Sequence, residues 1–184
     1  MNLIKRGLKF SLVLIVMLSI VNIGNTQAND DVVIPSGKKE FEKLYLRNIK
    51  KTRINGVYIP KDLDDAFKEL DALSPENAKL KFKNAAEDVI ATKLHFGLGR
   101  WIKVYWNFTE GSRYVEYLRQ MGLTDHDHMI QFTIVSYHRY KNNTPLEIEK
   151  RVEAYKIQRQ EHLLKMKARS KVIHTEIKKI DKKG

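Results

Sequence analysis

Four side chains that can bind anions or move protons stand in polar or glycine-rich stretches of the sequence: His95, Arg100, Arg113 and His138. An imidazole can act as a general acid or base near neutral pH, and a guanidinium presents a fork of donors that fits a carboxylate or a phosphate. A hydrolase-like site built from these residues is therefore one hypothesis for the function. It requires a concave pocket in which the four side chains converge.

A third catalytic candidate beside the two histidines is Ser112, which stands between Gly111 and Arg113. The neighbouring residues lack the Gly-x-Ser-x-Gly pattern that exposes a nucleophilic serine on a sharp turn. A serine directly before a helix commonly accepts a hydrogen bond from the first helical turn. The sequence thus favours an N-cap over a nucleophile at this position.

Two glycines and several aromatic residues lie close together in residues 95–106. The glycines could expose backbone amides to an anion, and the aromatic rings could stack on a sugar or base. A dinucleotide-binding motif would need a third glycine and a preceding strand, and the sequence has neither. Glycine also weakens a helix by about 1 kcal/mol and permits close packing. A ligand-binding loop and a close-packed turn both remain open. The ligand-binding alternative uses Gly97, Gly99, Arg100, Trp101, Trp106 and Arg113.

Acids and histidines alternate at residues 125–128, a pattern that resembles a metal site. Residues two apart on a helix project about 200° from each other, so His126 and His128 cannot share an ion in regular geometry. Asp125 as a helix N-cap explains the pattern more simply. The chain also has no cysteine, which excludes disulfides, thiolate zinc sites and iron–sulfur clusters. We expect no metal site and no cofactor.

Apolar residues recur at three- and four-residue steps through most of the chain, which predicts helices. Residues 54–60 contain Asn-Gly and end in a proline, so they are predicted to be an extended connector. No segment shows the sustained alternation of a strand. The sequence therefore predicts an all-α fold, a small single-domain helical bundle with a long basic C-terminal helix. The expected helices cover residues 38–52, 62–73, 75–94, 112–121, 125–140 and 145–180.

The first 28 residues have the three parts of a secretory signal. Lys5, Arg6 and Lys9 form a positive start, an apolar stretch covers residues 10–23, and small residues precede a cleavage point after Ala28. As a helix the apolar stretch would be about 21 Å long, short of a hydrocarbon core of about 30 Å. We therefore expect export to the periplasm or the medium after cleavage, with an uncleaved membrane anchor as the alternative.

Positive charge is concentrated in residues 147–184, which hold 12 Lys+Arg against 6 Asp+Glu, whereas residues 29–146 hold 19 against 16. Such a helix could contact an anionic envelope component, a membrane surface or an acidic protein, while export disfavours nucleic acid. Its charges could also serve only to keep it soluble, and its apolar steps could form a homo-oligomeric coiled coil. The cations expected at an anionic surface are Lys165, Lys167, Arg169, Lys171, Lys178 and Lys179.

Four motifs give the central part of the chain a resemblance to a known family. They are INGVYIPKDLDDAF at 54–67, HFGLGRWI at 95–102, GSR at 111–113 and SYHRY at 136–140. Together, over about residues 54–141, they resemble an uncharacterised bacterial domain family seen in short Bacteroidota-type proteins. The resemblance implies a domain boundary and transfers no catalytic residue.

The expected organisation is a signal peptide at 1–28, a helical lead at 29–53, the family-like domain at 54–146 and a basic C-terminal helix at 147–184. Because no coherent catalytic pattern accompanies the signal and the charged helix, we expect a binding or interaction module in the cell envelope. The hydrolase-like enzyme and the homo-oligomer through the C-terminal helix are the alternatives.

Overall fold

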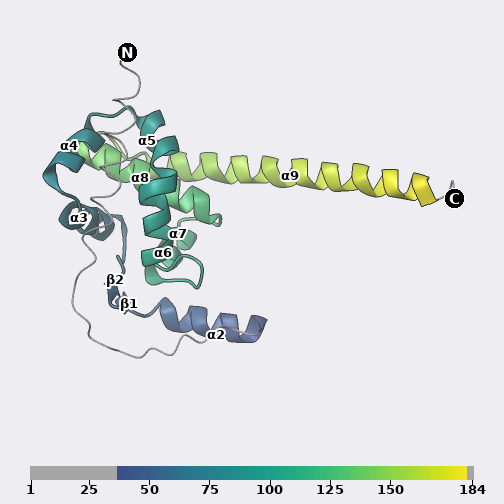
Figure 1. The fold of residues 1–184 in the computed structure, drawn as a ribbon, viewed down its shortest axis with the longest axis horizontal. Helices are drawn as coiled ribbons and strands as arrows, with labels where there is room; N and C mark the ends of the chain where they lie inside the picture. Colours follow the sequence, from purple (N-terminus) through teal and green to yellow (C-terminus); the bar gives the residue numbers. More distant parts are fainter. Residues whose placement is uncertain (1–36, 182–184) are drawn as a thin grey trace, which may run out of the picture.

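The computed structural model describes residues 37–181, and the side chains of residues 37–170. The expected signal peptide therefore lies outside the described residues. The elements, in chain order, are α2 (Lys38–Asn48), β1 (Arg53–Ile54), β2 (Val57–Tyr58), α3 (Leu63–Leu73), α4 (Glu76–Lys83), α5 (Glu87–Lys93), the π-helix η1 (His95–Gly99), α6 (Arg100–Tyr105), α7 (Arg113–Gln120), α8 (His126–Lys141) and α9 (Ile148–Asp181). The predicted all-α class is confirmed (Figure 1). Across these described elements, no helix is both long and apolar enough to cross a membrane.

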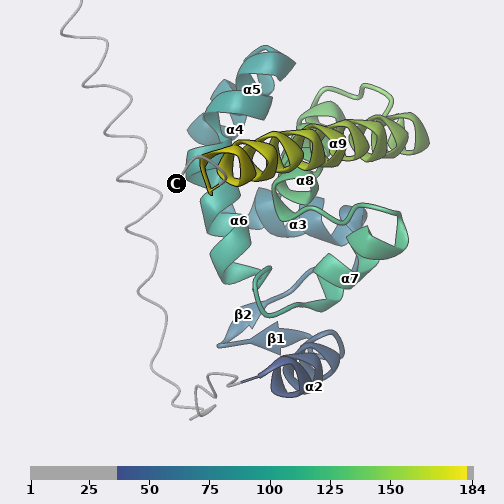
Figure 2. The same cartoon turned by 90° about the vertical axis from the view of Figure 1, so that its right-hand side faces the viewer.

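The two short strands form an antiparallel hairpin at the segment predicted to be an extended connector. Asn55 and Gly56 both have positive φ, 50° and 77°, as the two central residues of a tight hairpin turn require. The hairpin and α2 lie on the side of the body away from α4 and α5 (Figure 2).

Side-chain caps begin three of the helices, because each first turn has amides without a partner inside the helix. Asp62 accepts from Asp65 at α3, Ser112 from Val115 at α7, and Asp125 from the amides of residues 127 and 128 at α8. The predicted cap roles of Ser112 and Asp125 are confirmed.

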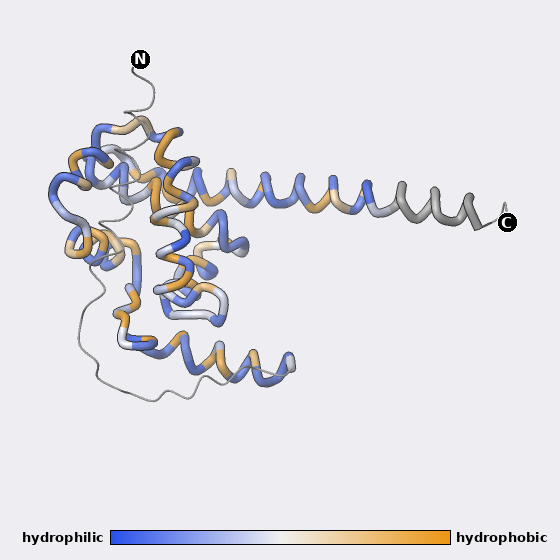
Figure 3. The backbone as a smooth tube through the Cα atoms, viewed as in Figure 1, coloured by the Kyte–Doolittle hydropathy of each residue, from blue (hydrophilic) through white to orange (hydrophobic). Residues whose placement is uncertain are grey.

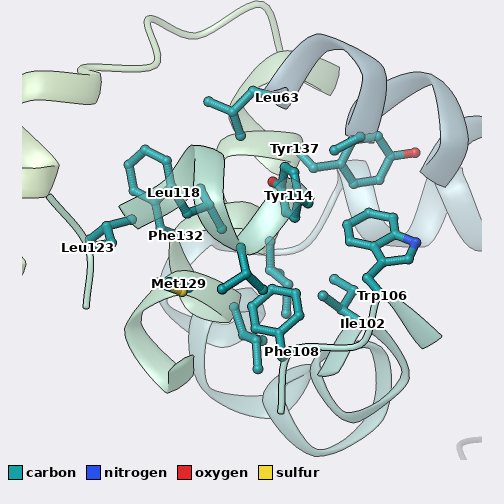
Figure 4. Packing of buried hydrophobic residues seen from close by; sticks show 14 of the residues in the cluster. Leu63, Ile102, Trp106, Phe108, Tyr114, Leu118, Leu123, Met129, Phe132 and Tyr137 are labelled. Carbon is teal, nitrogen blue, oxygen red and sulfur yellow. The ribbon is translucent and has the colours of Figure 1, made fainter. Parts of the chain in front are cut away.

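Helix α8 is the centre of the core. From Met129 to His138 every residue except Gln131 is buried, because α3, α4, α5, η1, α6 and α9 all pack against it. Trp106, Phe108 and Tyr114 converge on this helix from the α6–α7 region (Figure 4). A helix that is buried on nearly all sides needs apolar residues around its circumference, which α8 supplies.

The prediction of a single helix over residues 75–94 is wrong, because this segment forms two helices, α4 and α5, with non-helical backbone between them. Ala86 has extended backbone there, with ψ 144°. Carbonyl groups exposed by the break are paired from α8: the Nε2 atom of His138 lies 3.0 Å from the oxygen of Ala85, and Asn142 donates to that of Lys83 over 3.1 Å. Tertiary hydrogen bonds thus replace those that a continuous helix would make.

Helix α9 is about 51 Å long at 1.5 Å per residue and extends far beyond the body (Figure 1). Of its residues with described side chains, those of the first turns pack on the body and residues 161–170 are exposed. We call residues 148–160 the root of α9 and residues 161–181 its projecting part. Mostly hydrophilic positions with isolated hydrophobic ones mark the described projecting residues (Figure 3).

Candidate functional site

The glycine-rich segment is a π-helical insertion packed against α8. The amide of Gly99 donates to the carbonyl of Leu94, five residues earlier, over 2.9 Å. A Cβ atom on Gly99 would lie 2.8 Å from Cγ2 of Ile130, a contact closer than side chains make. Glycine at this position therefore permits close helix packing, as the close-packed alternative expects. Gly97 is half-buried, and its carbonyl accepts the amide of Arg100.

The two tryptophans of this segment have different surroundings. Trp106 is fully buried and meets the ring of Tyr114 edge-on, with centroids 5.1 Å apart. Trp101 is half-buried and stacks on Tyr105 at 5.1 Å. A ligand at the surface therefore cannot reach Trp106, which belongs to the core instead of a stacking platform.

Arg113 ties the start of α7 to the hairpin. Its Nε donates to the carbonyl of Ile59 over 2.6 Å, and its guanidinium lies over the ring of Tyr58 at 5.0 Å. Its Nη2 is 3.8 Å from the carboxylate of Asp65. Burial raises the pKa of this carboxyl, but hydrogen bonds from Lys61 and Tyr58 outweigh burial and hold the pKa below its usual value. Arg113 is thus occupied by structural contacts.

The two candidate histidines lie at opposite ends of α8. The Nε2 atom of His95 is 3.8 Å from Asp127 in the first turn, whereas His138 is buried at the other end against Phe82 and Ala85. Eleven residues of helix, about 16 Å, separate Asp127 from His138.

The four residues of the hydrolase-like hypothesis have separate surroundings, since Arg100 is exposed on α6 and Arg113 contacts the hairpin. The structure does not bring their side chains together, so this site is not assembled. Ser112 is buried, and its hydroxyl caps α7. No group of three histidines or acids that could hold a metal ion occurs in the described part of the chain.

The root of α9 is part of the core. Val152 is 4% exposed, and Ile148 and Tyr155 pack beside it on the same helix face. The root of α9 therefore packs on the body through this face.

Arg151 anchors this root to α8. Its guanidinium donates to the hydroxyl of Ser136 over 2.9 Å, to the carbonyl of Phe132 over 3.1 Å and to that of Leu146 over 3.3 Å. It also lies 4.6 Å from the centre of the Phe132 ring. Burial lowers the pKa of Arg151. No motif distinguishes this arginine from the other charges of the C-terminal segment, so the sequence did not reveal its role.

An apolar groove of about 280 Å³ opens where α9 leaves the body. At its edge Arg159 pairs with Asp125, the N-cap of α8, over 2.9 Å. The sequence did not reveal this groove, because its lining comes from the α7–α8 loop, α8 and α9. The lining residues are Gly122, Leu123, Thr124, His128, Tyr155, Lys156, Arg159, Gln160 and Leu163.

The projecting part of α9 exposes large apolar side chains. Leu163, Leu164 and Met166 are 47%, 59% and 52% exposed. The cations Lys165, Lys167 and Arg169 are exposed between and beside them. The side chains of Lys171, Lys178 and Lys179, expected to extend this basic surface, lie outside the described residues.

Residues 59–141 match the model of a family described as a domain of unknown function (DUF6794). The match covers less than half of the chain, so the similarity to this family is a property of this segment. The expectation of an uncharacterised domain family is confirmed for this segment. The match runs from Ile59, directly after β2, to Lys141 at the end of α8, so α2, the β1–β2 hairpin and α9 lie outside it. No curated protein and no solved structure matches the chain.

Proposed function

We propose that this protein is an exported interaction module, in which the DUF6794 domain holds the root of α9 and the projecting part contacts a partner. The observation that carries the proposal is the exposure of Leu163, Leu164 and Met166 on a helix that leaves the body. Apolar side chains gathered on an exposed surface are typical of interaction sites.

The stability of helices supports this proposal. An isolated helix in water is marginal even with favourable residues, and most helices in proteins are stabilised by packing of an apolar face. The root obtains this packing from α8. A partner would supply it to the projecting part.

Charge and export define the class of partner. Three described cations, Lys165, Lys167 and Arg169, stand on the projecting part, and the whole chain has a formal net charge of +12. An acidic protein or an anionic envelope component fits these charges. The signal-like residues 1–28 direct the protein to the envelope, where nucleic acid is scarce.

The test compares residues 29–184 with a form that ends at Gln160. The shorter form keeps the root, whereas an end at Leu146 would remove Val152 from the core. Both forms are used to capture partners from an envelope extract and to bind vesicles of anionic phospholipid. Retention by the longer form alone supports the proposal, and two forms that behave equally in capture, in vesicle binding and in their oligomeric state would refute it.

Export is tested separately by fractionating cells that express the whole chain. A product in the periplasm or the medium whose N-terminus is Asn29 supports cleavage after Ala28. A cytoplasmic product with an intact N-terminus would remove the envelope from the proposal, and an intact product in the membrane fraction would favour the anchor.

A further inference from the structure

One face of α9 continues from the root into the projecting part. Val152 and Tyr155 pack on the body, and Leu163, Met166 and Ser170 follow on the same face. From residue 163 onward, the positions on this face are separated by three and four residues in turn. The three positions after Ser170 in this pattern are all isoleucines. The positions of the pattern are 163, 166, 170, 173, 177 and 180. We call them the seam.

The seam has the width of a coiled-coil contact and not of a membrane-binding face. It is a stripe of two positions per seven residues, whereas a helix lying in a membrane has a broad apolar face with bulky aromatic residues. Leu164 stands at about 100° from Leu163 and 160° from Met166 around the helix, outside the stripe. Cations such as Lys167 and Arg169 border the stripe on its two sides, so the apolar face is narrower than a helix lying in a membrane requires.

We propose that the seam binds the seam of a second copy of this chain, in antiparallel orientation. This inference rests on the proposed function, because the contact is the same projecting part, but the apolar stripe favours a second copy of this chain in place of the acidic partner that the net charge alone suggests. Residue 163 of each copy then lies level with residue 180 of the other, 166 with 177, and 170 with 173.

The length of the projecting part favours this register. The overlap from residue 163 to 180 is about 27 Å long and stops beside the groove and Arg159, where the root ends. A shift of one heptad toward the root would place the end of the partner helix beside the body. A shift away from it would leave about a heptad of each seam uncovered.

Charge complementarity selects the antiparallel orientation. The positions that flank the seam on one side include Arg169 and Glu176, and in an antiparallel pair each faces the other on the partner copy. A parallel pair would instead place Arg169 opposite His174 and Glu176 opposite Asp181, which brings two acids together. Opposite charges at these positions favour pairing and like charges oppose it.

The assembly is tested by the mass in solution of residues 29–184, which include every described residue, at up to about 100 μM chain. We expect a dimer. Met166→Glu should raise the dissociation constant of the dimer at least tenfold by placing a charge in the seam. Leu164→Glu is the matched control, because it adds the same charge at a slightly more exposed neighbour outside the seam. A monomer, or equal effects of the two variants, would overturn the proposal.

The orientation is tested with single cysteines, since the chain has none of its own. Ser170→Cys and Ile173→Cys are prepared separately and oxidised alone and together. An antiparallel seam joins Ser170→Cys to Ile173→Cys in the mixture and leaves each variant alone mostly unlinked. Efficient linkage of either variant to itself indicates a parallel seam and overturns the orientation.

These outcomes separate the inference from the proposed function. A monomer that binds anionic vesicles or an envelope protein through the projecting part overturns the second copy as partner and keeps the interaction module. A monomer whose capture is the same with and without residues 161–184 refutes both.

Discussion

The root and the projecting part of α9 are one continuous helix with opposite surroundings. In the root, Val152 is 4% exposed and Arg151 makes hydrogen bonds to α8. In the projecting part, Met166 is 52% exposed. Apolar residues recur at the same helical spacing in both parts. The difference is that the body packs against the apolar face of the root and leaves that of the projecting part exposed. Periodicity identifies a face that must be covered, and only tertiary structure shows whether the same chain covers it.

Of the changes proposed here, a charge introduced into the root should lower the free energy of unfolding most. Val152→Asp places a carboxylate among apolar neighbours, so we expect the free energy of unfolding to fall by about 3–5 kcal/mol. Chemical denaturation measures the change. Met166→Asp introduces the same group into the projecting part and should leave the unfolding of the body nearly unchanged. Equal losses from both variants would show that the two regions have the same surroundings.

Much of the fold could be predicted from sequence because it depends on local chemistry. Ser112 and Asp125 cap helices, and Gly122 and Asn143 follow helices with positive φ, as their residue types indicate. The break at Ala86 could not be predicted, because the groups that pair with the freed carbonyls come from α8, more than fifty residues away.

The candidate site was harder to predict for the same reason. Residue type suggested His95 and His138 as partners, but His95 lies in η1 beside the first turn of α8, and His138 lies near the other end of that helix. The exposed seam residues could be recognised from spacing, while the role of Arg151 could not. Its acceptors are two backbone carbonyls and a serine hydroxyl, which leave no pattern in the sequence.

Removing the side chain of Arg151 should cause the second largest loss of stability. Arg151→Ala leaves the carbonyls of Phe132 and Leu146 without these donors, and we expect a loss of about 2 kcal/mol. Arg151→Lys should lose less, because one ammonium can reach only some of the acceptors. Thermal and chemical unfolding at neutral pH provide the measurement. An alanine variant as stable as the parent would mean that apolar packing alone holds the root.

The connection before α9 should make stability depend on pH. Arg139 donates to both carboxylate oxygens of Glu87 over 2.8 Å and to Glu147 over 2.6 Å. The hydrogen bond from Arg139 is the main cause that lowers the pKa of Glu87, with burial opposing it. A carboxyl with a lowered pKa contributes stability above its unfolded pKa of about 4.3 and loses that contribution as pH falls through the folded pKa.

Glu87→Gln removes this contribution. We expect a loss of about 1 kcal/mol at pH 7, kept small because the carboxylate is partly exposed, and a shallower fall in stability between about pH 5 and pH 3. Denaturation curves across this range measure both quantities. A variant with the same pH dependence as the parent would assign the acid sensitivity to other carboxylates, of which Asp71 is one with a lowered pKa.

The smallest effect should come from Leu164→Glu, which exchanges an exposed leucine for a helix-forming acid outside the seam. We expect the free energy of unfolding to change by less than about 0.5 kcal/mol and the mass in solution to stay the same. The result sharpens the comparison because Leu164 is slightly more exposed than Met166. If exposure alone made the projecting part an interaction surface, Leu164→Glu would disturb assembly as much as Met166→Glu. If the stripe is the contact, only the seam variant should do so.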